Sequence, residues 1–195
     1  MQTPVPAPEF PGRERLIEAL DTAACAGDTT QVTTAVRQAL CRLIADPAVR
    51  LPASLRATVA GRYARRALYR SARHGYSVVA MTWAPGQGTP VHDHDGVWCV
   101  EGVWEGELEV VQYEVLEREG ERLRFRPAGG MHAVRGSSGS LIPPHEYHSI
   151  RNPSDTGAAI SLHVYGRPLE TCSVFEPQDG EWHLRRLRVL ACDPG

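Results

Sequence analysis

The sequence predicts a mainly β fold, a β-barrel with a small helical region at its N-terminal end. Apolar residues recur at helical spacing in the first third of the chain. The remainder, after Tyr63, consists of short runs rich in Val, Ile, Trp and Tyr that are separated by Gly, Pro and Asp. Short strands with regular turn signals indicate a sandwich or barrel. The 195 residues suffice for one domain with a full core but are few for two.

The chain divides into three parts. Residues 1–12 contain four of the 15 prolines, so we expect a flexible arm. Residues 13–60 are expected to form two or three short amphipathic helices packed on the barrel, because they carry two apolar stripes: Leu16, Ile17 and Leu20, then Val32, Val36, Leu40 and Leu43. Residues 61–195 are the barrel domain, with strand-like runs at 77–83, 97–104, 107–113, 161–166 and 181–189.

The composition excludes several classes of protein. A net charge of −2 argues against nucleic acid as a partner, because binding a phosphate backbone needs a basic face. All 21 basic residues are Arg, which excludes Schiff-base chemistry through Lys and lysine-bearing phosphate loops, and which favours anionic ligands. The five cysteines form no CxxC pair, and no stretch of about 20 apolar residues occurs. We therefore expect a cytoplasmic protein with reduced thiols and no membrane contact.

Three histidines give the strongest chemical signal. His92 and His94 lie two residues apart in TPVHDHDGVWC. Because residues two apart on a strand face the same side, both imidazoles can reach one point inside a barrel. The third candidate is His148 in PPHEYHSIRN, which enters a strand-like run, whereas its competitor His145 follows two prolines and is expected in a turn. Three imidazoles with open positions opposite them suit a metal that binds a substrate and dioxygen together.

These residues resemble the two motifs of the cupin family. The likeness rests on Gly86, His92, His94 and Gly106 for the first motif, and on His148 and Asn152 for the second. Most metal-binding cupins also carry a Glu four or five residues after the second His. Trp98 and Cys99 stand at those positions here.

A cysteine in place of that Glu resembles one branch of the cupins, the thiol dioxygenases typified by mammalian cysteine dioxygenase. The segment SLHVYGRPLETCSVFE (161–176) is similar to the family's Ser-x-His-x-Tyr run and the Thr-Cys that follows it, and SVVAMTW and YARRALY also match. The resemblance covers about residues 60–190. It implies a cupin, jelly-roll-like β-barrel and an iron-dependent thiol dioxygenase, which adds both atoms of dioxygen to a thiol sulfur and forms a sulfinic acid.

The resemblance also implies roles for individual residues. His92, His94 and His148 would hold Fe(II), with dioxygen as co-substrate. Four residues would be catalytic: Ser161, His163, Tyr165 and Cys99. Of these, Ser161, His163 and Tyr165 alternate along one predicted strand and share a face, on which they can orient the phenol. Cys99 matches the cysteine that forms a thioether cross-link with the tyrosine matching Tyr165 in mammalian members, whereas many bacterial relatives have Gly there.

The expected substrate is a small thiol with a carboxylate. Arg65, in a Tyr63-x-Arg65 run that resembles the family's YxR segment, is expected to bind the carboxylate. Counting back from Trp83 without a gap nominates Arg66 instead, and strand alternation would turn one of the two inward and the other to solvent. Tyr63 and Trp83 are expected to line the pocket. Cys172, together with Arg rather than Gln at position 65, favours L-cysteine and a role in cysteine catabolism over 3-mercaptopropionate.

Two other kinds of function use the same histidines. A cupin isomerase, or a zinc or manganese hydrolase, would need an acid or base near the metal, and Glu101 and Asp95 are the nearby candidates. A sensory or storage cupin would bind a small anion through Arg without turnover. The cupin fold alone does not choose among them. The sequence is compatible with a monomer or a weak homo-oligomer.

Overall fold

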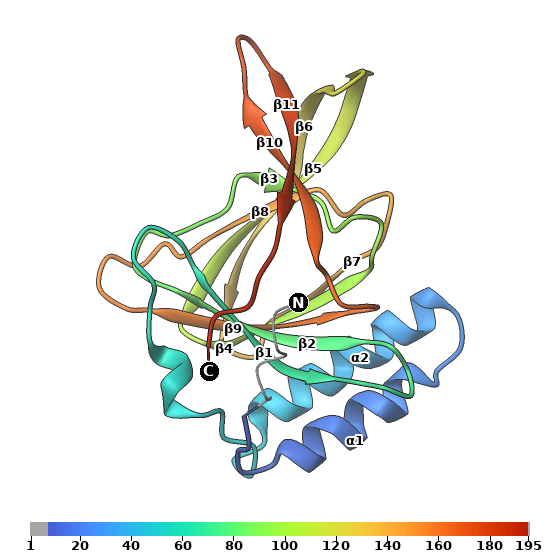
Figure 1. The fold of residues 1–195 in the computed structure, drawn as a ribbon, viewed down its shortest axis with the longest axis vertical. Helices are drawn as coiled ribbons and strands as arrows, with labels where there is room; N and C mark the ends of the chain where they lie inside the picture. Colours follow the sequence, from blue (N-terminus) through green and yellow to red (C-terminus); the bar gives the residue numbers. More distant parts are fainter. Residues whose placement is uncertain (1–7, 195) are drawn as a thin grey trace.

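The computed structural model describes residues 8–194, and it confirms a mainly β fold with two helices at the N-terminal end (Figure 1). Residues 1–7 of the predicted flexible arm, and Gly195, lie outside the described residues. The elements are α1 (Arg13–Ala24), α2 (Thr29–Ala45), the 3-10 helix η1 (Ala53–Arg56), β1 (Ala64–Arg70), β2 (Ser77–Trp83), β3 (Val91–His92), β4 (Cys99–Glu105), β5 (Glu107–Glu119), β6 (Arg122–Val134), β7 (Ser138–Leu141), β8 (His148–Arg151), β9 (Ala159–Tyr165), β10 (Thr171–Pro177) and β11 (Trp182–Val189).

The two α-helices form where the apolar stripes predict them. Helix α2 begins with a capping box, in which the Asp28 carboxylate accepts from the Gln31 N–H and the Gln31 side chain accepts from the Asp28 N–H, each at 2.9 Å. Its apolar stripe is buried, with Leu40 fully covered. Among the described residues, no helix is long and apolar enough to cross a lipid bilayer.

The strands form two antiparallel sets that face each other. One is a five-stranded sheet in the order β1-β2-β9-β4-β7, and the other six strands pair in the closed order β10-β11-β6-β5-β8-β3. The inner faces of the two sets meet in an apolar cluster that includes Met81 and Val103 from the first set and Leu108 and Ile150 from the second. The site described below lies between these two inner faces.

The helices cover the outer face of the five-stranded sheet (Figure 1). Val100 of β4 and Leu162 of β9 are fully buried in the same apolar cluster as Leu40 and Ile44 of α2. Helix α2 approaches β4 so closely that a Cβ added at Gly102 would lie 3.0 Å from the Ile44 Cδ1 atom. This packing fixes the sheet from behind, and it leaves the front face for the site.

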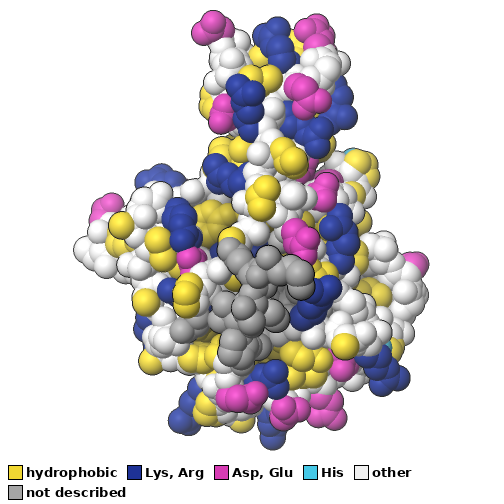
Figure 2. All heavy atoms as spheres, viewed as in Figure 1, with side chains coloured by type: hydrophobic (Ala, Val, Ile, Leu, Met, Phe, Trp, Pro, Cys, Tyr) yellow, Lys and Arg dark blue, Asp and Glu magenta, His cyan; other side chains and the backbone are white. Residues whose placement is uncertain are grey.

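The paired strands β5–β6 and β10–β11 extend beyond the barrel on the side away from the helices (Figure 1). Figure 2 shows Arg and acidic side chains mixed over this extension, and ion pairs such as Arg126–Glu114 at 2.7 Å cross its strands. Within this extension, strand β5 runs to Glu119, past the predicted end at residue 113. The added residues are mostly exposed, so they lack the apolar alternation by which a half-buried strand is identified.

Candidate metal centre and substrate pocket

The three predicted ligand histidines lie together inside the barrel. His92 on β3 and His148 on β8 are partners across neighbouring strands, and their ring centroids are 4.2 Å apart. The His94 ring lies 5.4 Å from that of His92 and 4.9 Å from that of His148. One nitrogen of each ring lies within 4.8 Å of the other two. The competitor His145 is exposed in the bend before β8 and is not part of the cluster.

Acidic neighbours shape the backbone that carries His92 and His94. The Asp93 carboxylate accepts hydrogen bonds from the backbone N–H of Ser173 at 2.7 Å and from that of Asp95 at 3.2 Å. Asp95 and Gly96 then take left-handed conformations, with φ of 53° and 69°. Gly adopts this conformation without a steric cost, and Asp tolerates it better than most residues do. The chain therefore turns sharply after β3 and His94 stays buried.

The histidine rings offer unprotonated nitrogens to the space between them. The Nδ1 atoms of His92 and His148 lie 3.2 Å and 2.9 Å from the backbone oxygens of Pro90 and Glu146, so each Nδ1 carries the hydrogen and each Nε2 keeps its electron pair. The His148 Nε2 atom is buried, and it has no hydrogen-bond partner among residues 8–194.

The charge state of the rings also suits a cation. Burial lowers the pKa of His92 to about 4, and it holds the pKa values of His94 and His148 well below their usual range. The three imidazoles are therefore neutral at physiological pH. A cluster of neutral, unpaired imidazole nitrogens fits a divalent transition-metal ion.

A cavity of about 20 Å³ adjoins these histidines, and the predicted substrate residues Tyr63, Arg65 and Trp83 line it. The Tyr63 and Trp83 rings are stacked with centroids 4.6 Å apart. The Arg65 guanidinium is buried, and its Nη2 atom donates to the Leu169 carbonyl at 2.9 Å. Its Nε–H, also buried, has no hydrogen-bond partner in the described part of the chain. A permanently charged guanidinium with a free donor thus faces the same space as His92 and His94 of the histidine cluster.

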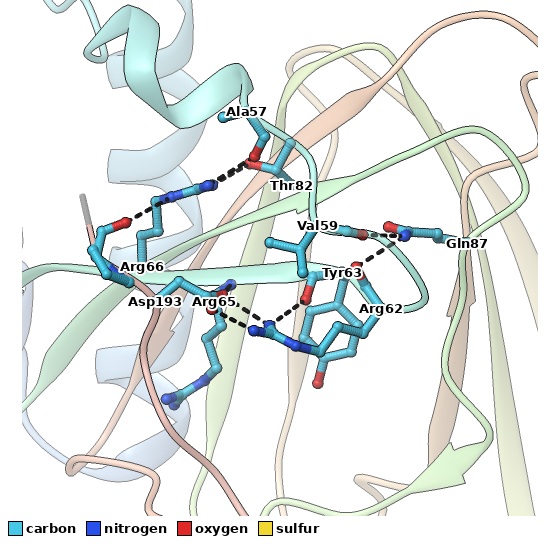
Figure 3. Close-up of polar contacts among 10 residues, drawn as sticks. Ala57, Val59, Arg62, Tyr63, Arg65, Arg66, Thr82, Gln87 and Asp193 are labelled. Carbon is cyan, nitrogen blue, oxygen red and sulfur yellow. Dashed lines mark hydrogen bonds and ion pairs between the residues drawn. The ribbon is translucent and has the colours of Figure 1, made fainter.

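Arg66 lies on the opposite face of β1, and the two guanidinium groups point in different directions (Figure 3). The Arg66 side chain donates to the backbone oxygens of Ala57 at 2.8 Å, Leu55 at 3.3 Å and Pro194 at 3.2 Å. The expectation that one of the two arginines faces solvent is wrong, because each is only 6% exposed. Leu55, Ala57 and Pro194, whose backbone oxygens accept these bonds, cover the face of the strand that alternation assigned to water.

Ser161, His163 and Tyr165 alternate along β9 and all three are buried on its inner face, as predicted. The Ser161 Oγ atom accepts from the Trp83 indole N–H at 2.9 Å and lies 2.8 Å from the His163 Nε2 atom. The Tyr165 ring stacks on that of His163 at 6.1 Å and meets the His94 ring edge-on at 5.4 Å. The polar chain along β9 therefore ends against a predicted metal ligand.

Cys99 and Tyr165 are direct partners across β4 and β9. The Cys99 Sγ atom lies 3.9 Å from the His163 Nδ1 atom. Burial raises the pKa values of the Cys99 thiol and the Tyr165 phenol well above their usual ranges, and a hydrogen bond with Tyr165 partly opposes the shift of Cys99. Both groups thus keep their protons at physiological pH.

Glu101, which the sequence offered only as a candidate acid or base for a non-oxidative enzyme, lies beside two histidines of the site. Its Oε2 atom lies 3.5 Å from the His163 Nδ1 atom and 3.9 Å from the His148 Nε2 atom. None of the described residues forms a hydrogen bond with this oxygen. Burial raises the pKa of this carboxyl to about 7. A signal was available, because Glu101 lies two residues after Cys99 and therefore on the same face of the strand.

The C-terminal residues around Arg65 are a part of the site that the sequence did not predict. The Asp193 carboxylate accepts from the Arg62 guanidinium and from the Arg65 backbone N–H, both at 2.9 Å (Figure 3). These hydrogen bonds, with that to Arg62 the larger cause, lower the pKa of Asp193 to about 2. The Cys192 Sγ atom lies 3.2 Å from the Arg65 Nη1 atom. No local pattern indicates these contacts, because their partners are about 130 residues apart in the chain.

Comparison with protein families gives a match over most of the barrel. A family model described as cysteine dioxygenase type I matches residues 58–178. Cysteine dioxygenase type 1 of Danio rerio is 24% identical over 105 residues, which cover 54% of this chain and 52% of that protein. The Homo sapiens protein of the same name is 24% identical over 106 residues, with the same two coverages. The chain thus spans about half the length of the curated relatives it matches.

Solved structures give weaker matches. The structure of TT1209 from Thermus thermophilus has a TM-score of 0.47 and 22% identity, covering 62% of this chain and 98% of that one. A Klebsiella pneumoniae protein with a double-stranded β-helix domain also has a TM-score of 0.47, with 16% identity, covering 72% and 93%.

Proposed function

Because the chain belongs to the cysteine dioxygenase type I family, we propose that it is a non-haem, iron-dependent thiol dioxygenase that converts L-cysteine to cysteine sulfinic acid. The observation that carries the proposal is the small cavity lined by Arg65, His92 and His94, in which two of the three clustered histidines face a buried guanidinium. A thiol that also bears a carboxylate matches that pairing of a metal-binding histidine cluster with a fixed positive charge.

His92, His94 and His148 would hold the ferrous ion. Bound there, Fe(II) would favour the thiolate form of the substrate and activate dioxygen. Because the three imidazoles are neutral, they leave the full charge of the ion to attract an anionic sulfur. Backbone oxygens hold the Nδ1 hydrogens of His92 and His148, so these two rings need no rearrangement to present Nε2.

Arg65 would bind and orient the substrate carboxylate. Its contacts with Leu169 and Cys192 fix the guanidinium, and its free Nε–H is available as a donor. Charge-assisted hydrogen bonds of this kind select amino-acid-like thiols over thiols without a carboxylate. Tyr63 and Trp83 would exclude water from one side of the cavity.

Ser161 and His163 would keep Tyr165 in place beside the substrate. The Glu101 carboxylate faces His163 Nδ1, which favours the tautomer with the hydrogen on Nδ1 and leaves Nε2 to accept from the Ser161 hydroxyl. Tyr165, whose phenol stays protonated, would then serve as a hydrogen-bond donor near the reacting sulfur. The cross-strand pairing of Cys99 with Tyr165 supports the proposed thioether cross-link.

A variant of this proposal is 3-mercaptopropionate as the substrate, since that thiol carries the same carboxylate. A second candidate function is a non-oxidative, metal-binding cupin (an isomerase, a hydrolase or a sensor). The observation that favours an isomerase or hydrolase is Glu101, a buried carboxyl near His148 of the histidine cluster. Its pKa is raised to about 7, and such a group can act as a general acid or base.

We further propose that the protein is cytoplasmic, with residues 13–60 as the helical region and 61–195 as the barrel domain. All five cysteines are free thiols, which is in keeping with a reducing compartment. The proposal also includes a monomer or weak homo-oligomer that binds neither nucleic acid nor membranes.

The test is dioxygen uptake by the ferrous-reconstituted protein with L-cysteine, 3-mercaptopropionate and cysteamine, with the products identified by mass. We expect stoichiometric uptake and a sulfinate from L-cysteine, and none in His148→Ala. Uptake with 3-mercaptopropionate alone would replace the substrate. If no thiol supports uptake although the iron site is filled, the oxidative proposal is wrong and the non-oxidative functions take precedence.

A further inference from the structure

The barrel interior contains a second cavity that the proposed chemistry does not use. It has a volume of about 180 Å³ and lies between β4 and β7 on one side and β5 and β6 on the other. Its lining includes five aliphatic side chains, namely Val103, Leu108, Val110, Ala133 and Leu141, together with Gly and Ser residues of β6 and β7. Four of the five are buried, with exposed fractions of 5% or less. The part of the cavity that these four buried side chains line is apolar, and an apolar space of this kind is poorly hydrated.

The inner wall of the second cavity lies next to the histidine cluster. Glu101 and Ser161 line the cavity. The same Glu101 carboxylate reaches within 3.9 Å of the His148 Nε2 atom, and Ser161 contacts His163, which lines the substrate cavity. One layer of side chains therefore separates the apolar space from the nitrogens that would hold the metal.

The first cavity leaves little room for a second reactant. Its volume is about 20 Å³, and a thiol held by Arg65 beside His92 and His94 would fill it. Dioxygen must reach the same centre, and it is a small, neutral and apolar molecule. Apolar cavities accept such molecules because entry requires no loss of hydrogen bonds to water.

We propose that the second cavity binds dioxygen and delivers it to the metal centre across the wall formed by Glu101 and Ser161. This inference rests on the proposed dioxygenase function. It assigns the two barrel cavities to different reactants, the thiol to the cavity at Arg65 and dioxygen to the cavity at Val110. The Glu101 side chain, which lies between His148 and this space, is the part of the wall that would have to move.

The first test needs no activity. Crystals of the protein pressurised with xenon, an apolar atom that reports gas-accessible cavities, should show xenon among Val103, Leu108 and Val110. Ordered water filling this space to Glu101, with no xenon, would overturn the inference.

The second test separates dioxygen from thiol kinetics. Val110→Phe places a ring in the cavity, whereas Val115→Phe, on the exposed part of the same strand, is the matched control. We expect Val110→Phe to raise the KM for dioxygen about fivefold or more while the KM for L-cysteine and the kcat at saturating dioxygen stay unchanged. Val115→Phe should change none of the three.

The outcomes separate failure of this inference from failure of the proposed function. Normal uptake with an unchanged KM for dioxygen in Val110→Phe refutes the route, and so does an equal loss for both reactants, which would indicate general damage. Absence of uptake in the unmodified protein refutes the function. In that case xenon in the cavity would assign it as an apolar ligand site and remove the delivery role.

Discussion

The two adjacent arginines of β1 allow a test in which one substitution affects specificity and the other affects stability. Arg65→Gln removes the fixed charge from the substrate cavity. A hydrogen bond to a charged group is worth about 1.5 to 3 kcal/mol, so kcat/KM for L-cysteine should fall by roughly 10- to 150-fold. Cysteamine has no carboxylate for Arg65 to bind. Any residual activity with cysteamine should therefore change less than threefold or so.

Arg66→Gln is the matched control, because Arg66 has the same exposure but faces away from the cavity. Its guanidinium is the donor for three backbone carbonyls, so the substitution should lower the free energy of unfolding by about 2 to 4 kcal/mol. The folded fraction should keep its kcat/KM.

An oxygen electrode gives the rates, and urea titration gives the stability of each variant. An equal loss of L-cysteine and cysteamine turnover in Arg65→Gln would contradict a carboxylate site at Arg65, and so would a loss of L-cysteine selectivity in Arg66→Gln alone. The second result would transfer the carboxylate site to Arg66.

Three further predictions follow from the same site. Turnover should form a thioether bond between Cys99 and Tyr165, with dioxygen accepting the two hydrogens that are lost. Intact mass should show a protein two hydrogens lighter, and any such loss in Cys99→Ser would contradict the assignment. Metal removal by a chelator should lower the Tm, because an ion at about 100 times its Kd stabilises the fold by about 2.7 kcal/mol. A Tm that is unchanged, or that drops equally in His148→Ala, would argue against metal binding by the three histidines. Burial lowers the pKa of His163 from 6.5 to about 3, so between these values the unfolded chain binds a proton that the folded chain excludes. The metal-free protein should therefore lose about 1.4 kcal/mol of stability per pH unit from this residue as pH falls through that window. Urea titrations at several pH values give the slope of the unfolding free energy against pH. A shallower slope in His163→Gln supports the prediction, and an unchanged slope refutes it.

Much of the fold could be predicted because its signals are local. The apolar stripes of α1 and α2, and the short runs rich in Val, Ile and Trp that form β2, β4 and β9, each depend on residues within one element. The same holds for His92 and His94, whose spacing puts them on one side of a strand. His148 could be placed against them because its run also reads as a strand.

The surroundings of Arg65 and Arg66 could not be predicted, since they come from distant parts of the chain. Strand alternation places Arg66 on the opposite face from Arg65, but it does not reveal that Leu55, Ala57 and Pro194 cover that face. Glu101 shows a different limit. Its position on the inner face is predictable, whereas its distance from His148 depends on how the two sheets approach each other.

The different roles of the two faces of β9 limit how the protein can be modified. Its residues 160, 162 and 164 anchor the sheet to the helices, while Ser161, His163 and Tyr165 carry the polar chain. A single inserted residue would exchange these two sets and place polar groups in the apolar layer. The helical layer can therefore accept changes of similar volume, whereas β9 must keep its length and register. A library that aims at new thiol substrates should vary the cavity wall at positions 63, 83 and 169 and leave β9 intact.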